Sequence, residues 1–239
     1  MINSIAPPAA VLGEFRTLLN AARASGDTEA TAMTLATAGA DGGISARTVL
    51  LKDVDARGFV FYTNLASNKG QDLQENPRAA LLFFWKALRL QTGPGDTAKQ
   101  VSPAGDTAKQ VSPAGDTAKQ VSLAGDTAKQ VQVKIEGDVE AVSSSEADEY
   151  FASRPRESQI GAWASKQSET LDARDVLTQR IAQFNAQFDG VAVPRPPHWS
   201  GFRVLPNMIE FWFGAPFRLH ERVRHELIDG TWRSRVLFP

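Results

Sequence analysis

Three side chains near the carboxyl end of the chain are spaced so that they could act on one ligand. Arg218, His220 and Arg222 occupy alternate positions after Gly214 and Pro216. Alternate residues of a β-strand face the same side, so a strand here would place two guanidinium groups and an imidazole together. Such a face suits an anionic aromatic ligand, because two fixed cations flank a titratable ring. The alternation alone fits a solvated basic edge strand equally well.

Further donors suited to an anion are scattered through the chain. Arginine, lysine, hydroxyl and amide groups hold a phosphate monoester through charge-assisted hydrogen bonds. The candidates of these types are Arg47, Lys52, Tyr62, Thr63, Ser67, Lys69, Gln167 and Ser168. Any one of them, taken singly, is more simply a surface polar residue or a helix cap, so the prediction depends on the whole set.

A second set, Tyr150, Arg154 and Ser158, has a regular spacing of four residues. If this stretch is helical, the three side chains fall along one face and make a second anion site. The sequence contains no glycine-rich dinucleotide fingerprint, P-loop or Gly-x-Ser-x-Gly elbow. Two phosphate-suited sites without a nucleophile–base pair predict an enzyme whose cofactor supplies the reactive chemistry.

The composition argues against several other classes of protein. The 239 residues carry 26 Lys+Arg and 27 Asp+Glu, and a net charge of −1 gives no reason to expect a nucleic-acid partner. The absence of cysteine excludes disulfides and thiolate metal sites, and three histidines argue against a multi-histidine metal site. No leader sequence or membrane-spanning stretch is apparent. We therefore expect a cytoplasmic protein of one domain, residues 1–239, with no metal and no membrane partner.

The first half of the chain predicts one helix followed by short strands. The apolar spacing over residues 8–24 is that of an amphipathic helix. Brief Gly and Asp turns separate the next apolar runs, which favours an antiparallel meander over βαβ units. Ser67 is expected to cap a short helix that ends at Glu75. The expected strands are 33–38, 45–54, 59–64 and 79–85.

The second half predicts helices followed by closing strands. Alternation over 131–142 indicates a further strand. The expected helices are 145–153, 158–165 and 172–188, the first of them capped by Ser145. The expected closing strands are 202–213, 218–228 and 231–237. Asp229 and Gly230, between the last two, are a strong hairpin signal.

Residues 92–132 do not follow this pattern. The sequence Gly-Asp-Thr-Ala-Lys-Gln occurs four times at a strict interval of ten residues, beginning at Gly95. Each unit is net neutral and has little apolar mass, so burial cannot offset the entropy of ordering it. We expect a flexible low-complexity loop inserted into an existing hairpin, with a stacked β-solenoid as the alternative.

Four ordered motifs make the chain resemble the pyridoxamine 5′-phosphate oxidase family. They lie at residues 47–52, 62–69, 154–168 and 210–222, and the match covers nearly the whole chain outside 92–132 and the extreme N-terminus. The resemblance implies a mainly β fold with flanking helices (α+β), which is an antiparallel FMN-binding split β-barrel. It implies a homodimer with FMN at the interface. It also implies oxidation of pyridoxamine or pyridoxine 5′-phosphate to pyridoxal 5′-phosphate, with O₂ as acceptor and H₂O₂ as product.

The resemblance also assigns roles to individual residues. Those assigned to FMN are Arg47, Thr48, Val49, Leu50, Leu51, Lys52, Tyr62, Thr63, Lys69, Gln167, Ser168, Trp212 and Arg222. Those assigned to the substrate are Lys52, Tyr150, Arg154, Ser158, Arg218 and His220, with Tyr150, Arg154 and Ser158 on its phosphate. Arg218 and His220 would be the catalytic pair, which orients the pyridine ring and stabilises charge.

Three features depart from the family pattern. Asn68 stands among the FMN-binding residues where the family often has arginine, and Phe213 follows Trp212 where the family usually has glutamine. The repeats split the hairpin that carries a flavin-contacting glutamine, so that role falls to Gln132 or Gln91. We favour Gln132, because the matching strand continues directly after it.

Two other functions are compatible with these residues. A related split-barrel flavin oxidase acting on another ring, such as a phenazine precursor, has no need of the phosphate set Tyr150, Arg154 and Ser158. A non-catalytic module that binds flavin or pyridoxal phosphate is suggested by the repeats and by Asn68. Turnover with added FMN would separate an oxidase from such a module.

Overall fold

The computed structural model describes residues 5–88 and 128–239. Its strands are β1 (Ala32–Ala38), β2 (Ile44–Leu50), β3 (Asp53–Val54), β4 (Phe59–Asn64), β5 (Arg78–Leu88), β6 (Lys129–Ala141), β7 (Trp199–Phe213), β8 (Glu221–Ile228) and β9 (Thr231–Leu237). Its helices are α1 (Ala9–Ala24), α2 (Asn68–Glu75), α3 (Ser144–Ala152), α4 (Arg156–Ala164), α5 (Arg174–Gln187) and the short 3-10 helix η1 (Pro216–Arg218).

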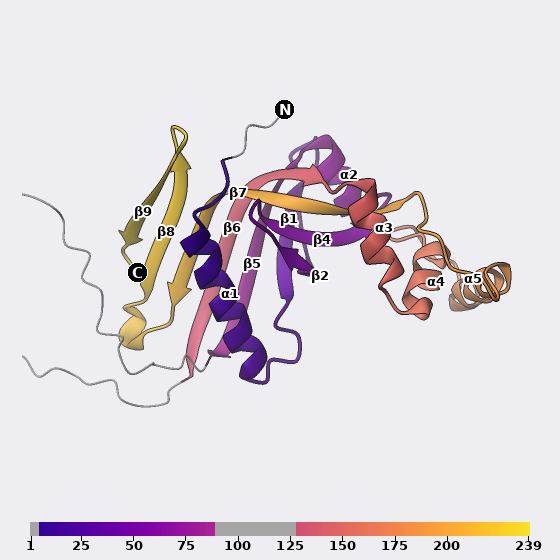
Figure 1. The fold of residues 1–239 in the computed structure, drawn as a ribbon, viewed down its shortest axis with the longest axis horizontal. Coiled ribbons are helices and arrows are strands. Elements are labelled where there is room, and N and C mark those ends of the chain that lie inside the picture. Colours follow the sequence, from indigo (N-terminus) through magenta and orange to yellow (C-terminus); the bar gives the residue numbers. More distant parts are fainter. Residues whose placement is uncertain (1–4, 89–127) are drawn as a thin grey trace, which may run out of the picture.

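One curled sheet organises these elements. Its strand order is β2-β1-β5-β6-β7-β4-β3, and β8 and β9 continue from β7. Every pairing among the described strands is antiparallel, which confirms the predicted sheet type. Helix α1 lies across one face of the sheet, while α3, α4 and α5 gather at the end opposite β8 and β9 (Figure 1).

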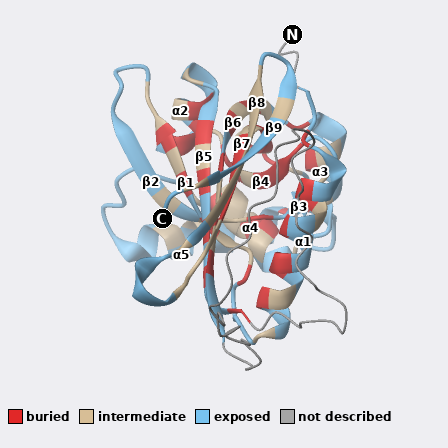
Figure 2. Ribbon diagram, turned by 90° about the vertical axis from the view of Figure 1, so that its left-hand side faces the viewer, coloured by how far each residue is buried: buried red, intermediate tan, exposed pale blue. Residues whose placement is uncertain are grey.

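The main core lies between α1 and the sheet. As predicted, α1 is amphipathic, and its buried face packs against the central strands (Figure 2). Phe15 is fully buried and meets Phe59 and Phe83 edge-on, with ring centroids 4.9 and 5.1 Å apart. Burying aromatic rings of this size contributes a large share of core stability. This core therefore anchors β4, which carries several of the predicted site residues.

The predicted strand at 45–54 is instead two strands, β2 and β3. The chain changes its hydrogen-bond partner between them. The Leu51 N–H donates to the Thr31 carbonyl, whereas the Lys52 N–H donates to the Val60 carbonyl of β4. The Leu51 side chain is buried in the core at this crossing, so one continuous alternation cannot run through it.

The borders of β6 and β7 also differ from the prediction. β6 begins at Lys129, so the last four residues of the segment predicted as a loop belong to a strand. β7 begins at Trp199, three residues earlier than expected. The repeats between 92 and 127 lie outside the described residues, as does Gln91. The loop and solenoid predictions for the repeats therefore stay predictions.

The prediction of a strand over 218–228 is wrong at its start. β8 begins only at Glu221. Before it, Phe217 and Arg218 have φ values of 57° and 64° within η1. Left-handed backbone cannot continue a pleated strand. The shared strand face predicted for Arg218, His220 and Arg222 therefore does not form, and only Arg222 lies in β8.

Tyr150, Arg154 and Ser158 do not lie on one helix either. Tyr150 belongs to α3 and Ser158 to α4, while Arg154 lies in the break between them. Pro155 causes the break, because proline lacks an N–H group and clashes with the preceding turn. The three side chains nevertheless meet, as described below.

Serines cap helices α2 and α3. Ser67 caps α2 as predicted, and its hydroxyl accepts a hydrogen bond from the Gly70 N–H. At α3 the cap is Ser143 rather than the predicted Ser145. Ser143 has extended backbone and accepts from the Glu146 N–H, which is the geometry a cap requires.

Helix α5 lies within the predicted range of 172–188 but buries none of its residues. Its apolar residues at helical spacing are Val176, Leu177, Ile181, Phe184 and Phe188, and of these only Phe188, just beyond its end, is buried. No helix in the described ranges is long and apolar enough to cross a membrane.

Candidate functional site

A cavity of about 610 Å³ opens where β2 and β4 meet α2, α3 and α4. This volume suits a small-molecule ligand. The predicted residues that line it are Thr48, Val49, Leu50, Lys52, Tyr62, Thr63, Lys69, Tyr150, Arg154, Ser158 and Gln167. The lining residues that were not predicted are Asn64, Pro155, Gly161, Ala162, Ser165 and Trp199.

A nearly buried ammonium group lies in the cavity wall. Lys69 is 9% exposed and donates to Ser67 Oγ at 3.1 Å and to Gln167 Oε1 at 3.0 Å. The Thr63 hydroxyl also donates to Gln167 Oε1, at 3.4 Å. Burial lowers the pKa of Lys69, and the neighbouring Arg47 lowers it further. Since these hydrogen-bond partners are neutral, a bound anion would relieve the cost of burying the charge.

Arg47 stands beside Lys69 without lining the cavity itself. Its guanidinium donates to the Thr37 hydroxyl at 2.6 Å and pairs with the Asp72 carboxylate at 3.7 Å. Thr37 also donates to Asp72, at 2.5 Å. Burial lowers the pKa of Arg47 despite the opposing effect of Asp72. Asp72 and Thr37 thus hold a second positive charge close to Lys69.

Another cation, Arg154, lines a part of the cavity away from Lys69 and Arg47. Its Nη1 atom is buried and, among the described residues, has no hydrogen-bond partner. The guanidinium carbon lies 4.8 Å from the ring centroid of Trp199 and 5.5 Å from that of Phe151, a cation–π arrangement. Burial lowers the pKa of Arg154. An unsatisfied buried guanidinium nitrogen beside a cavity is an anion-binding group in chemical terms.

Three stacked aromatic rings connect Arg154 to the sheet. The rings of Tyr62, Tyr150 and Trp199 are nearly parallel, and the Tyr62 centroid lies 4.1 Å from that of Tyr150 and 5.2 Å from that of Trp199, which are 6.1 Å from each other. Gly201 of β7 makes room for the Tyr62 ring. A Cβ atom at Gly201 would lie only 2.7 Å from two carbons of the Tyr62 ring.

A Gly201→Ala variant is expected to lose about 1–3 kcal/mol of unfolding free energy, because the added methyl group displaces the Tyr62 ring. Gly13→Ala in α1 is the matched control, because an added Cβ there meets nothing within 4 Å. That change should instead stabilise the protein by about 0.5–1 kcal/mol through helix propensity. Urea unfolding of both variants measures the two values, and effects of the same sign would contradict this account.

Tyr62 also predicts a specific pH dependence of stability. Burial, and next the charge of Glu146, raises the pKa of Tyr62 to about 12 from 10.0. The folded state therefore keeps the phenol proton where the unfolded chain loses it. This contribution to stability is fully present below pH 10 and is lost as the pH rises through 12. Urea unfolding at pH 8 and pH 11 should show a steeper loss for the wild type than for Tyr62→Phe; parallel losses would rule the contribution out.

A second group of predicted residues lies away from the cavity, across β6, β7 and β8. Gln132 pairs with Trp212, and Trp212 pairs with Arg222, so the three side chains form one row on the same face. The His220 ring lies 4.4 Å from that of Trp212. Arg222 makes two hydrogen bonds to Glu210 Oε1, at 2.7 and 2.9 Å. None of these residues lines the cavity of this subunit.

The other predicted residues take intermediate places. The Asn68 N–H donates to the Ser168 hydroxyl at 3.4 Å, close to Lys69 in the chain but outside the cavity lining. Leu51 points into the core. Arg218 is exposed in η1. Within the described ranges, no three or more His, Cys, Asp or Glu side chains are grouped so that they could hold a metal ion.

Trp199 is the main site residue that sequence reasoning missed. It supports both Tyr62 and Arg154, and it is 6% exposed. The predicted strand began at 202, after the Pro-rich segment, which left Trp199 in a loop. The signal that was available is the spacing of Trp199 and Gly201. Residues two apart in a strand lie on the same face, so a strand here places a glycine beside an aromatic ring.

Solved structures identify the class of this fold. PhzG from Burkholderia lata 383, in complex with tetrahydrophenazine-1-carboxylic acid, matches with a TM-score of 0.76 at 28% identity, over 98% of this chain and 94% of its own. An FMN-binding, pyridoxamine 5′-phosphate oxidase-related protein from Nostoc punctiforme PCC 73102 matches with a TM-score of 0.63 at 14% identity, over 98% and 100% of the two chains. The second likeness shows the fold alone. This chain is a split-barrel protein.

The sequence comparisons identify the family within that class. The family profile described as pyridoxamine 5′-phosphate oxidase matches residues 15–188, and the profile described as the pyridoxine 5′-phosphate oxidase C-terminal dimerisation region matches residues 199–239. The chain belongs to the pyridoxamine 5′-phosphate oxidase family, as its motifs predicted.

Curated relatives support this assignment. A pyridoxine/pyridoxamine 5′-phosphate oxidase from Xanthomonas campestris pv. campestris (strain 8004) is 50% identical over 232 residues, which cover 97% of this chain and 98% of the relative. One from Caulobacter vibrioides (strain NA1000 / CB15N) is 47% identical over 208 residues, which cover 87% and 75%.

Proposed function

We propose that this chain is an FMN-dependent oxidase of phosphorylated B6 vitamers. It converts pyridoxine 5′-phosphate and O₂ to pyridoxal 5′-phosphate and H₂O₂. With pyridoxamine 5′-phosphate, one water is also consumed and one ammonia is released. The observation that carries the proposal is the presence of two separate cations in the lining of one cavity, the buried Lys69 and the half-buried Arg154 with its buried Nη1 atom.

The surroundings of Lys69 fit the phosphate of FMN. Lys69 and the Thr63 hydroxyl supply donors, Gln167 fixes both, and Arg47 adds charge behind them. The segment 48–50 and Lys52 line the adjoining wall and would contact the rest of the cofactor. Bound FMN would supply the redox chemistry that couples oxidation of the vitamer to reduction of O₂.

The surroundings of Arg154 fit the phosphate of the substrate. Arg154 has a buried N–H without a partner, and Tyr150 and Ser158 add hydroxyl groups to the same lining. Charge-assisted hydrogen bonds to a phosphate would satisfy the guanidinium. Because Tyr62 and Trp199 fix the ring of Tyr150 and the plane of Arg154, this group is held in place before the substrate arrives.

A second subunit would complete the site. Arg218 lies in η1, and His220 directly precedes β8. Strand β8 lies at the end of the molecule opposite α4 (Figure 1). In a homodimer, the partner's copies of these residues would orient the vitamer ring and stabilise charge that develops on it. The partner's Gln132, Trp212 and Arg222 would cover the flavin. The C-terminal profile, described as a dimerisation region, supports this arrangement.

The phenazine-type alternative rests on the likeness to PhzG. PhzG shares 28% sequence identity with this chain, whereas the vitamer oxidases share 47–50% over most of it. Arg154, Tyr150 and Ser158 also occupy the cavity together, although a substrate without phosphate has no use for them. Both observations favour the vitamer oxidase.

An absorbance spectrum followed by an oxygen-coupled assay tests the proposal. Purified protein supplied with FMN should show flavin bands and should release H₂O₂ with pyridoxine 5′-phosphate and with pyridoxamine 5′-phosphate. Bound flavin without turnover of either vitamer would instead indicate a binding module. Turnover that does not depend on the substrate phosphate would favour the phenazine-type alternative.

A further inference from the structure

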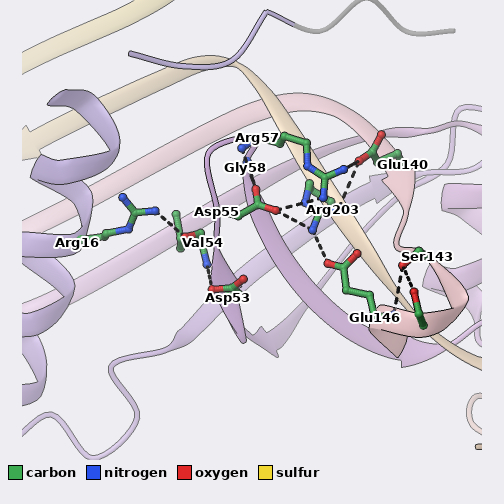
Figure 3. Close-up of polar contacts among 11 residues, drawn as sticks. Arg16, Asp53, Val54, Asp55, Arg57, Gly58, Glu140, Ser143, Glu146 and Arg203 are labelled. Atoms are coloured by element: carbon green, nitrogen blue, oxygen red, sulfur yellow. Dashed lines mark hydrogen bonds and ion pairs between the residues drawn. The ribbon is translucent and has the colours of Figure 1, made fainter. Parts of the chain in front are cut away.

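A buried arginine outside the cavity gathers three carboxylates from three parts of the chain (Figure 3). Arg203 of β7 is 1% exposed. It pairs with Asp55 at 2.8 Å and with Glu140 at 3.3 Å, and its third partner is Glu146. Asp55 belongs to the turn before β4, Glu140 to β6 and Glu146 to the first turn of α3. This arginine cluster therefore ties α3 to the sheet.

Two of the three carboxylates, Asp55 and Glu140, hold Arg203 in place and, among the described residues, make no hydrogen bond or ion pair through which they would hold α3. Asp55 accepts hydrogen bonds from the Arg57 and Gly58 N–H groups, which holds it in its turn. Glu140 also pairs with Arg57, at 3.2 Å. Arg203 is thus anchored on the sheet side independently of α3. Glu146 is the member of the cluster through which that anchor reaches the helix.

The anchored helix carries one wall of the substrate-phosphate site. Tyr150 lies one turn after Glu146, so the two side chains share a face of α3. The Tyr62 ring stacks on the Tyr150 ring, and the Tyr62 hydroxyl donates to the Glu146 carbonyl at 3.5 Å. Arg154 lies two residues after the end of α3, next to its C-cap Ser153. A shift of the first turn of α3 would therefore move Tyr150 and Arg154 together.

Stability alone does not explain such a cluster. Removing a guanidinium and carboxylates from water costs about as much as their attraction returns, so buried ion pairs are weak stabilisers. What they supply is a defined geometry, because each partner must be met at hydrogen-bond distance. Asp148, on the exposed side of α3, has a separate pair with Arg195 at 2.6 Å, so the helix stays attached when one tether is lost.

We propose that Arg203 and Glu146 are positioning residues that set the preference for phosphorylated over unphosphorylated vitamers. This inference rests on the proposed function, since it concerns the phosphate of that substrate. Neither residue touches the substrate. Both act by fixing the place of Tyr150 and Arg154.

The test uses Glu146→Gln, which keeps the shape of the side chain and removes its charge. In the flavin-loaded protein, kcat/KM for pyridoxine 5′-phosphate should fall about 10-fold, because a displacement well below 1 Å already weakens catalysis. For unphosphorylated pyridoxine, kcat/KM should stay within about 2-fold of wild type, because no phosphate has to be placed. The Kd for pyridoxal 5′-phosphate, followed by tryptophan fluorescence, should rise about 10-fold.

Glu140→Gln is the matched control, because it removes a carboxylate from the same arginine without touching α3. It should leave both the selectivity and the Kd for pyridoxal 5′-phosphate near wild type, and Glu146→Asp should restore part of the loss. Equal effects of the two glutamine variants, or no change of Kd in Glu146→Gln, would overturn the positioning role. If the wild type shows no turnover, the oxidase proposal fails, while the Kd comparison still decides the role of Glu146.

Discussion

An Arg154→Met variant is expected to lose about 100-fold in kcat/KM for pyridoxine 5′-phosphate while it retains its flavin. The reason is that two hydrogen bonds from a guanidinium to a phosphate are together worth roughly 3 kcal/mol. In the described structure the buried Nη1 atom of Arg154 has no competing partner, so it is available to the phosphate. Initial rates of H₂O₂ release across a range of substrate concentrations measure the effect.

The Arg154 prediction has two controls. Unphosphorylated pyridoxine should be oxidised at nearly the same low rate by the wild type and by Arg154→Met. Arg174→Met removes a guanidinium at the exposed start of α5 and should change neither rate. A comparable loss with both substrates would mean that Arg154 supports the fold through its contacts with Trp199 and Phe151 and does not bind phosphate.

A Lys69→Met variant is expected to bind FMN roughly 100-fold more weakly than the wild type, because a charge-assisted contact to its phosphate is removed. The stability of the flavin-free protein should stay the same or increase. Burial and Arg47 both lower the pKa of Lys69, which means that the folded protein holds this charge at a cost. The substitution should therefore lower the affinity for FMN without lowering the free energy of unfolding.

Quenching of FMN fluorescence gives the affinity, and urea unfolding of the flavin-free protein gives the stability. Lys86→Met, at an exposed position of β5, is the control and should alter neither. A loss of stability in Lys69→Met that matches its loss of affinity would show that Lys69 is structural, through Ser67 and Gln167, and is not a phosphate ligand.

Local signals were sufficient for much of the fold. Ser67 as a helix cap, the hairpin at Asp229 and Gly230, and the amphipathic helix before β1 depend on nearby residues only, so a single sequence contains them. Asp229 and Gly230 both have positive φ, as a two-residue hairpin turn demands.

The failures come from interactions that a single sequence does not mark. Left-handed backbone is ordinarily signalled by glycine or asparagine, so Phe217 and Arg218 gave no warning that the strand begins later. Tyr150, Arg154 and Ser158 would lie along one face only if their stretch were a single helix, but Pro155 divides it.

The assembly of the site was predictable only in part. Residue types indicated two anion sites. The contact between Lys69 and Gln167, however, joins residues 98 positions apart in the sequence and depends on how the chain after α4 returns to the sheet. The resemblance to a family supplied that pairing. It did not indicate that Arg222 would be engaged by Glu210, or that Asp72 and Thr37 would hold Arg47, because these partners lie outside the motifs.

The central claim is that each active site combines the cavity of one subunit with Arg218 of the other, and subunit complementation tests it most directly. Arg154→Met and Arg218→Met, each nearly inactive alone, are co-expressed with different tags so that mixed dimers form. In a mixed dimer one site carries both substitutions and the other carries neither, so a random mixture should recover about one quarter of wild-type turnover. Recovery no greater than the sum of the two separate variants would contradict a shared site.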